Sequence, residues 1–101
     1  MCEFKIIRKN DSSQILEDIV ILSYNENNEL ELKDVIGMGE ILESALILNV
    51  NTMNQKCIIL ENPLIKDFIS LINNVHENKS NKSEIDRFIN KLDNLKSELK
   101  S

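Results

Sequence analysis

The spacing of the hydrophobic residues changes at Asn62-Pro63, and this change constrains the fold more than any other feature of the chain. Before it, apolar and polar side chains alternate, as in residues 29–33, which is typical of strands buried on one side. After it, apolar side chains recur at three- and four-residue steps, which is typical of amphipathic helices. Asn62 suits a helix N-cap and Pro63 the first helical position. The sequence therefore predicts a mainly β unit over residues 1–61 and a helical extension over residues 62–101.

The β unit is predicted to contain five or six short strands in about 60 residues. One strand starts almost at Met1, and another is expected to run from Ile15 to Tyr24. The only glycines, Gly37 and Gly39, flank one methionine and predict a tight hairpin or bulge. So many short strands favour a small closed or nearly closed sheet, because an open sheet would leave strand edges exposed.

The extension is predicted to be a two-helix hairpin. A polar loop is expected over residues 77–82, after which Ser83 and Asp86 are predicted to cap the second helix. Each helix carries one apolar stripe, the first through Leu64, Ile65, Phe68, Ile69, Ile72 and Val75, the second through Ile85, Phe88, Leu92, Leu95 and Leu99. These stripes are expected to be packed, and three partners stay open: the β unit, the same hairpin of a second subunit, or another protein.

Charge and length exclude several classes of function. Residues 1–61 carry five Lys/Arg against eleven Asp/Glu, whereas residues 62–101 carry seven against six. A nucleic-acid surface needs clustered basic side chains to neutralise phosphates, so nucleic-acid binding is not expected. No apolar run approaches the roughly 20 residues that span a bilayer, and no secretory signal is evident. We expect a cytoplasmic protein without a membrane partner.

Cys2 is the residue with the most distinctive chemistry. A thiolate beside backbone nitrogens, and beside the α-amine if Met1 is removed, forms a donor set that suits square-planar Ni(II) or Cu(II). Cys57 lies in an apolar strand and is expected to be a small core residue. His76, the only histidine, is expected at the end of the first helix, where it complements the helix dipole. One isolated histidine gives no catalytic arrangement, so an enzyme is not predicted and no catalytic residue is nominated.

Five segments of the chain resemble the small nickel-binding proteins of the CooT type, and together they cover residues 1 to about 61. They are Met1-Cys2-Glu3-Phe4-Lys5-Ile6, Glu17-Asp18-Ile19-Val20, Leu32-Lys33-Asp34-Val35-Ile36-Gly37, Ala45-Leu46-Ile47-Leu48-Asn49-Val50-Asn51 and Ile58-Ile59-Leu60. The resemblance implies a small SH3-like β-barrel, a homodimer, and delivery of nickel to carbon monoxide dehydrogenase or a related enzyme. It does not extend to the helical hairpin.

Two functions of different classes follow from these observations. The first is a nickel-binding, metallochaperone-like accessory protein that uses Cys2 as a ligand of Ni(II) at a dimer interface, with a nickel enzyme as its client. The second is a metal-free interaction module in which the β unit is a scaffold and the helical hairpin recruits a partner. Loss of nickel uptake in Cys2→Ser would separate the two.

Overall fold

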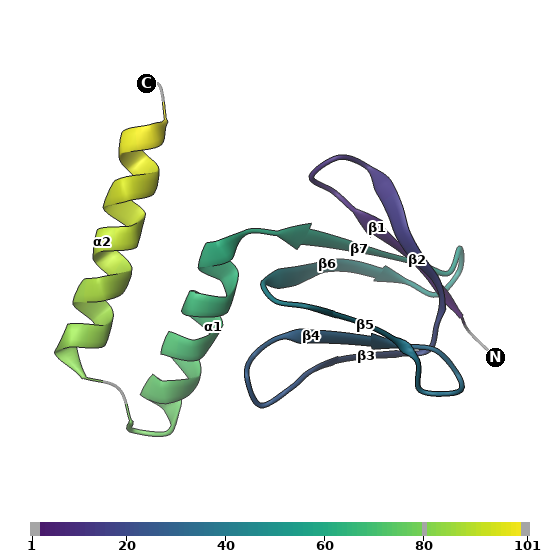
Figure 1. Cartoon of the computed structure of the whole chain (residues 1–101), viewed down its shortest axis with the longest axis horizontal. Helices are drawn as coiled ribbons and strands as arrows, with labels where there is room; N and C mark the ends of the chain where they lie inside the picture. Colours follow the sequence, from purple (N-terminus) through teal and green to yellow (C-terminus); the bar gives the residue numbers. More distant parts are fainter. Residues whose placement is uncertain (1–2, 80, 100–101) are drawn as a thin grey trace. The chain divides into compact units, whose positions relative to one another are not determined.

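The computed structural model describes residues 3–79 and 81–99, which form a mainly β structure followed by two helices (Figure 1). This confirms the predicted fold class at the level of β strands followed by a helical pair. The elements in chain order are β1 (Phe4–Arg8), β2 (Ser13–Ile19), β3 (Ile21–Tyr24), β4 (Leu30–Lys33), β5 (Gly39–Leu42), β6 (Ala45–Asn51), β7 (Lys56–Glu61), α1 (Pro63–His76) and α2 (Lys82–Glu98).

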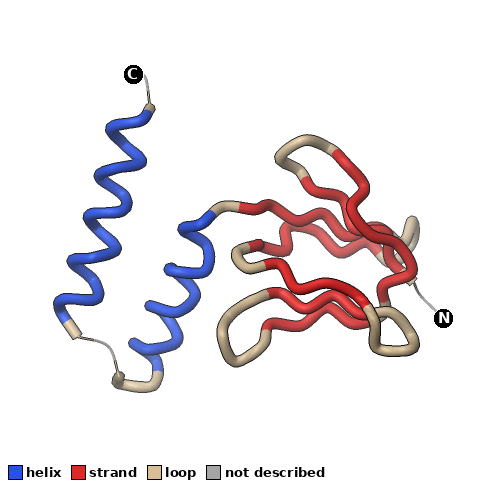
Figure 2. The backbone as a smooth tube through the Cα atoms, in the orientation of Figure 1, coloured by secondary structure: helices blue, strands red, loops and turns tan. Residues whose placement is uncertain are grey.

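The strands form two sheets, with the orders β2-β1-β7-β6 and β3-β4-β5 (Figure 2). The pair β1–β7 is parallel and every other pair is antiparallel. Across residues 3–79 and 81–99, hydrogen bonding between strands does not close into a single barrel. The architecture is therefore two small sheets, each with edge strands.

The single strand predicted from Ile15 to Tyr24 is wrong, because the chain changes sheet within it. β2 ends at Ile19 and β3 begins at Ile21. The N–H of Val20 donates to the carbonyl of Lys33 at 2.9 Å, so this one residue connects the first sheet to the second. The run of apolar residues continues through the corner, and for this reason the sequence pattern does not reveal it.

One core lies between the two sheets and takes side chains from both. Its eight buried members are Phe4, Ile6, Ile19, Leu30, Leu32, Ala45, Cys57 and Ile59. The only tyrosine joins the sheets with its hydroxyl: Tyr24 on β3 donates to the carbonyl of Ala45 at 2.7 Å and accepts from the N–H of Ile47 at 3.3 Å. A large apolar side chain contributes about 1.5–3 kcal/mol when fully buried, so this core stabilises the sheets.

The first turn of α1 is fixed to the sheets around Ser44. As predicted, α1 begins at Pro63, and the Asn62 carboxamide accepts from the N–H of Leu64 at 2.9 Å. The Ser44 hydroxyl accepts from the N–H of Lys66 at 2.9 Å and donates to the carbonyl of Asn62. The chain divides into two compact units after Lys66, residues 1–66 and residues 67–101. We call them the sheet unit and the hairpin unit.

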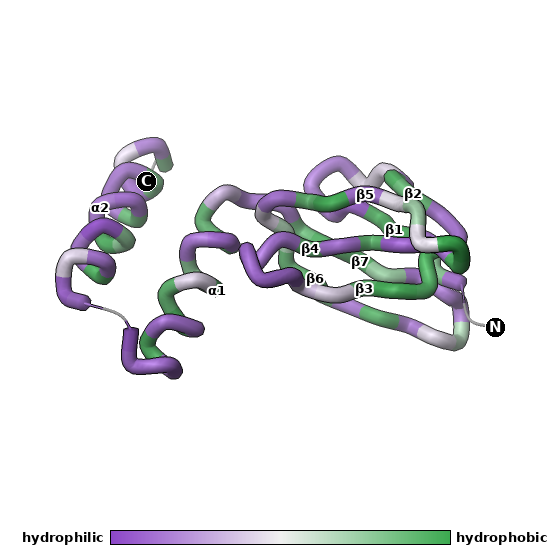
Figure 3. Tube along the Cα trace, turned by 60° about the horizontal axis from the view of Figure 1, so that its bottom comes forward, coloured by the Kyte–Doolittle hydropathy of each residue, from purple (hydrophilic) through white to green (hydrophobic). Residues whose placement is uncertain are grey.

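In the hairpin unit, pairs of described side chains connect α1 and α2. The rings of Phe68 and Phe88 lie 5.9 Å apart, Lys91 forms a 2.8 Å ion pair with Asp67, and the Asn74 amide donates to Glu84 at 2.9 Å. Leu71 is the buried residue of α1, and no described residue of α2 is buried. Hydrophilic and hydrophobic residues alternate along both helices (Figure 3). The helices thus contact one another, but much of each predicted apolar stripe stays exposed.

The predicted cap of α2 at Ser83 and Asp86 is wrong. The N-cap is Asn81, whose side chain accepts from the N–H of Glu84 at 2.9 Å. Ser83 lies inside the first turn and donates its hydroxyl to the same Asn81 oxygen at 2.7 Å. Asn81 and Ser83 are both residue types that favour an N-cap, and Asn81 takes this position. Among the described residues, neither helix has the length and apolar character needed to cross a bilayer.

Candidate metal site at the start of the first strand

Cys2, the metal ligand that the sequence predicts, lies outside the described residues, whereas the residues that follow it are described. Glu3 directly precedes β1 and is partly buried. Lys5 pairs with Lys56 at the start of the parallel strand β7, and the N–H of Lys5 donates to the carbonyl of Gln55 at 2.9 Å. The first residues of β1 are therefore fixed at the end of the sheet where the turn between β6 and β7 lies.

Three carboxylates line a shallow hollow beside the start of β1. They are Glu3, Asp18 near the end of β2 and Asp34 directly after β4, and Val35 and Ile36 complete the lining. The hollow has a volume of about 270 Å³. Residues that are far apart in sequence thus form one acidic surface. Glu3, the residue that follows Cys2, is part of this surface.

The loop between β4 and β5 is built around Asp34. The Asp34 carboxylate accepts from the N–H groups of Ile36 and Met38, each at 3.0 Å, and the Asp34 N–H donates to the Met38 carbonyl at 2.7 Å. Gly37 has φ of 87°, a left-handed conformation that favours glycine. At Gly39 a Cβ atom would lie 1.8 Å from the carbonyl oxygen of Leu32. The predicted tight hairpin is confirmed. Gly37 suits its left-handed backbone conformation, and Gly39 has no room for a side chain beside the backbone of Leu32.

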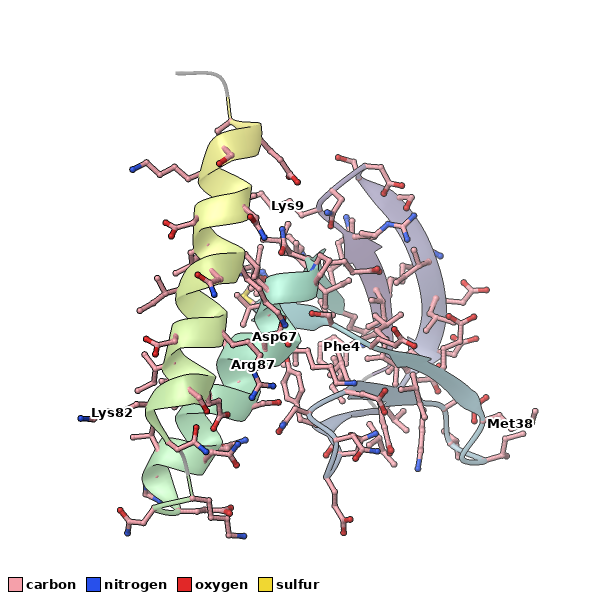
Figure 4. All side chains as sticks on the ribbon, turned by 60° about the vertical axis from the view of Figure 1, so that its left-hand side comes forward. Phe4, Lys9, Met38, Asp67, Lys82 and Arg87 are labelled. Carbon is pink, nitrogen blue, oxygen red and sulfur yellow. The ribbon has the colours of Figure 1, made fainter. Side chains whose placement is uncertain are left out.

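Exposed apolar side chains surround this end of the sheet unit. Val35, Ile36 and Met38 are 60%, 78% and 66% exposed, and Met53 in the turn between β6 and β7 is 95% exposed. Both loops lie at the end of the sheets where β1 starts (Figure 1). Met38 extends from the tip of its loop away from the strands (Figure 4). This end therefore combines acidic side chains with apolar ones that a second protein could contact.

The other two candidate ligands weighed in the sequence are not among the residues that line the hollow. Cys57 is fully buried in the core, as predicted, and this burial raises the pKa of its thiol. His76 is the last residue of α1 and is exposed. Within residues 3–79 and 81–99, no three His, Cys, Asp or Glu side chains form a group that could hold a metal ion.

Comparison with known protein families gives no matching family model, and comparison with curated proteins gives no similar one. The sequence interpretation selected Cys2 and did not select Glu3, Asp18 or Asp34 as part of a site. The excess of acidic residues over residues 1–61 was the available signal, but it does not reveal which of them converge. Only the pairing of the strands and the Asp34 loop bring these three together.

Proposed function

We propose that this chain is a nickel-binding accessory protein of the CooT type, in which Cys2 supplies a thiolate to Ni(II). The acidic hollow at Glu3, Asp18 and Asp34 is the observation that carries the proposal, because Glu3, the residue that follows Cys2, lines it. Clustered carboxylates raise the local concentration of cations at a site. In this proposal they attract the metal, and sulfur and backbone nitrogen bind it.

The proposal includes an SH3-like barrel and a homodimer. Two small sheets that share a core and meet at Val20 are compatible with such a barrel. A two-fold axis close to β1 would bring two Cys2 residues together, so that each subunit supplies one thiolate to a shared site. The client would be a nickel enzyme, and the exposed side chains of Ile36 and Met38 offer it a contact surface beside the metal.

Nickel titration of the purified chain tests this function. We expect stoichiometric uptake with a thiolate-to-nickel absorbance band in the wild type, loss of both in Cys2→Ser, and neither loss in Cys57→Ala. The affinity should fall as the pH is lowered, because a thiol with a free pKa of about 8.5 must lose its proton to bind. Uptake that survives Cys2→Ser unchanged would contradict the proposal.

A pair of charge-neutralising variants tests the role of the hollow. Asp18→Asn removes a carboxylate that lines it, and Glu17→Gln removes the neighbouring one, which does not. We expect Asp18→Asn to weaken nickel binding severalfold at low ionic strength and Glu17→Gln to have little effect, since charge at the site steers the cation. Equal affinities of the two variants would show that the hollow plays no part.

A second candidate, the metal-free interaction module, is favoured by one specific observation. Phe68, Ile72 and Val75 on α1 and Ile85, Ile89 and Leu92 on α2 are large apolar residues that stay between 41% and 51% exposed. A monomeric protein rarely keeps so many neighbouring apolar side chains in water. If the chain binds no nickel and its hairpin unit binds a protein, the module becomes the better assignment.

A further inference from the structure

We propose that the hairpin unit is a dimerisation surface, on which the apolar side of α1 and α2 packs against the same side of a second copy of this chain. The result would be a four-helix arrangement with two helices from each chain. This inference names a partner for the interaction-module candidate and rests on that candidate. It does not require nickel or Cys2.

The two sides of the hairpin differ in chemical character. A groove runs along one side, where the polar residues Asp67 and Ser70 on α1 lie opposite Arg87 and Lys91 on α2, and Leu71 and Phe88 also line it. Asp67 and Arg87 are labelled on their helices in Figure 4. The Lys91–Asp67 ion pair belongs to this side. The charged side chains that line the groove are thus partly paired with one another inside the hairpin.

Each exposed apolar residue of α1 comes one position after a residue on the side of the helix that faces α2. Asp67 and Asn74 contact α2 through Lys91 and Glu84. Phe68 and Val75 each follow one of these residues by one position, and one position turns a side chain by about 100° around the helix axis. Ile72 follows the buried Leu71 in the same way. Ile72 and Val75 are therefore turned by about a quarter of a circle from α2, and Phe68 lies at the edge of this stripe, where its ring also contacts Phe88.

The apolar residues of α2 have the same relation to its contacts with α1. Ile85, Ile89 and Leu92 each follow by one position a residue on the contact side, namely Glu84, Phe88 and Lys91. The contacts run antiparallel, since Asp67 meets Lys91 while Asn74 meets Glu84. In two antiparallel helices that face each other, the same turn moves both stripes to the same side of the pair. We call this the apolar hairpin face: Phe68, Ile72, Val75, Ile85, Ile89 and Leu92.

The size of the apolar hairpin face fits a dimer. If a large apolar side chain has an area of about 150–200 Å², six that are roughly half exposed present on the order of 500 Å². This is at the upper end of what monomers leave in water, and it is more than half of the roughly 800 Å² per partner in a stable interface. The polar residues around the face would supply much of the rest.

The charge of the hairpin favours a second copy over a strongly acidic or basic partner. Residues 62–101 carry seven Lys/Arg against six Asp/Glu, so two hairpins approach with little net repulsion. Beside the face, α2 exposes both signs, with Lys82, Asp86, Asp93 and Lys96. A two-fold interface uses the same patch on both chains, and an uncharged apolar face bordered by both signs meets this requirement.

Sedimentation of the metal-free Cys2→Ser chain tests the inference, because any dimer held by nickel is then removed. We expect twice the chain mass of 11.7 kDa. Ile89→Glu combined with Leu92→Glu should weaken the dimer by at least about 100-fold, since it puts charge at the centre of the apolar hairpin face. Asn94→Glu adds a charge on the far side of α2 and should leave the dimer intact. Helix content by circular dichroism checks that all variants fold.

Three results would overturn the inference. A dimer that survives Ile89→Glu with Leu92→Glu must use another surface. A monomer that binds a fluorescent apolar dye through this face, and loses the dye in the double variant, has an open face for a different protein and retains the interaction module. A monomer that binds no dye has a covered face, and then the interaction module fails as well.

Discussion

The sheet unit and the hairpin unit use their apolar residues in opposite ways. In the sheet unit, both sheets contribute to one core whose members include Ile6, Leu32 and Ile59, each fully buried. In the described part of the hairpin unit, Leu71 is the buried hydrophobic residue, and six large apolar side chains stay 41–51% exposed. Sheets that enclose a core have their own source of stability, whereas an isolated helical pair depends on tertiary packing. This difference is the reason for our proposal that a second copy of the chain packs against the hairpin.

Deletion of buried side chains should give the largest difference between the two units. We expect Ile59→Ala to lower the free energy of unfolding by about 2–5 kcal/mol, because it leaves a cavity that close-packed neighbours cannot fill. Leu71→Ala should cost less, at or below the lower end of that range, because its surroundings are open enough to relax. Urea unfolding of both variants measures this, and equal losses would contradict the comparison.

Removal of the hydroxyl that joins the two sheets should have a smaller effect. Tyr24→Phe removes the donor to Ala45 and the acceptor for Ile47, and we expect a loss of about 1–2 kcal/mol in the free energy of unfolding. Ser23→Ala on the same strand is the control, because its hydroxyl makes only a 3.5 Å contact with a neighbouring carbonyl. A loss in Ser23→Ala as large as in Tyr24→Phe would show that the bridge does not matter.

Alkaline pH should weaken the sheet unit modestly. Burial is the largest cause that raises the pKa of Cys57 above its ordinary 9.0 and that of Tyr24 above its ordinary 10.0. Both groups lose protons more readily in the unfolded chain, so this stability is complete below about pH 9 and is lost as the pH rises through the folded-state values. Urea midpoints between neutral and alkaline pH should show the loss, and Cys57→Ala should show less of it. A midpoint that rises with pH would contradict the assignment.

Truncation should have the smallest effect on the sheets. A chain that ends after Lys66 keeps the 3.4 Å ion pair of Lys66 with Glu29 and the hydrogen bonds around Ser44. We expect its strand signal in circular dichroism and its unfolding midpoint to stay close to those of the sheets in the full chain. A truncated chain that is wholly unfolded would contradict the division into two units.

Much of the fold is predictable from local patterns. Leu30 and Leu32 alternate with charged residues and are both fully buried on β4, and Asn62-Pro63 starts α1 as its residue types favour. The corner at Val20 is not predictable, because apolar residues continue through it and its cause is the pairing with Lys33 of another strand. The acidic hollow is missed for a similar reason, since strand pairing and loop geometry bring its three carboxylates together.

Hydrogen exchange of the metal-free Cys2→Ser chain, measured at several protein concentrations, tests the central claim most directly. The account predicts that amides of the core strands β1, β4 and β7 stay protected to the same degree at every concentration. Amides of α1 beyond Lys66 and of α2 should gain protection as the concentration rises, because a second copy stabilises them. Helices that are as protected as the strands at the lowest concentration, with no dependence on concentration, would contradict it.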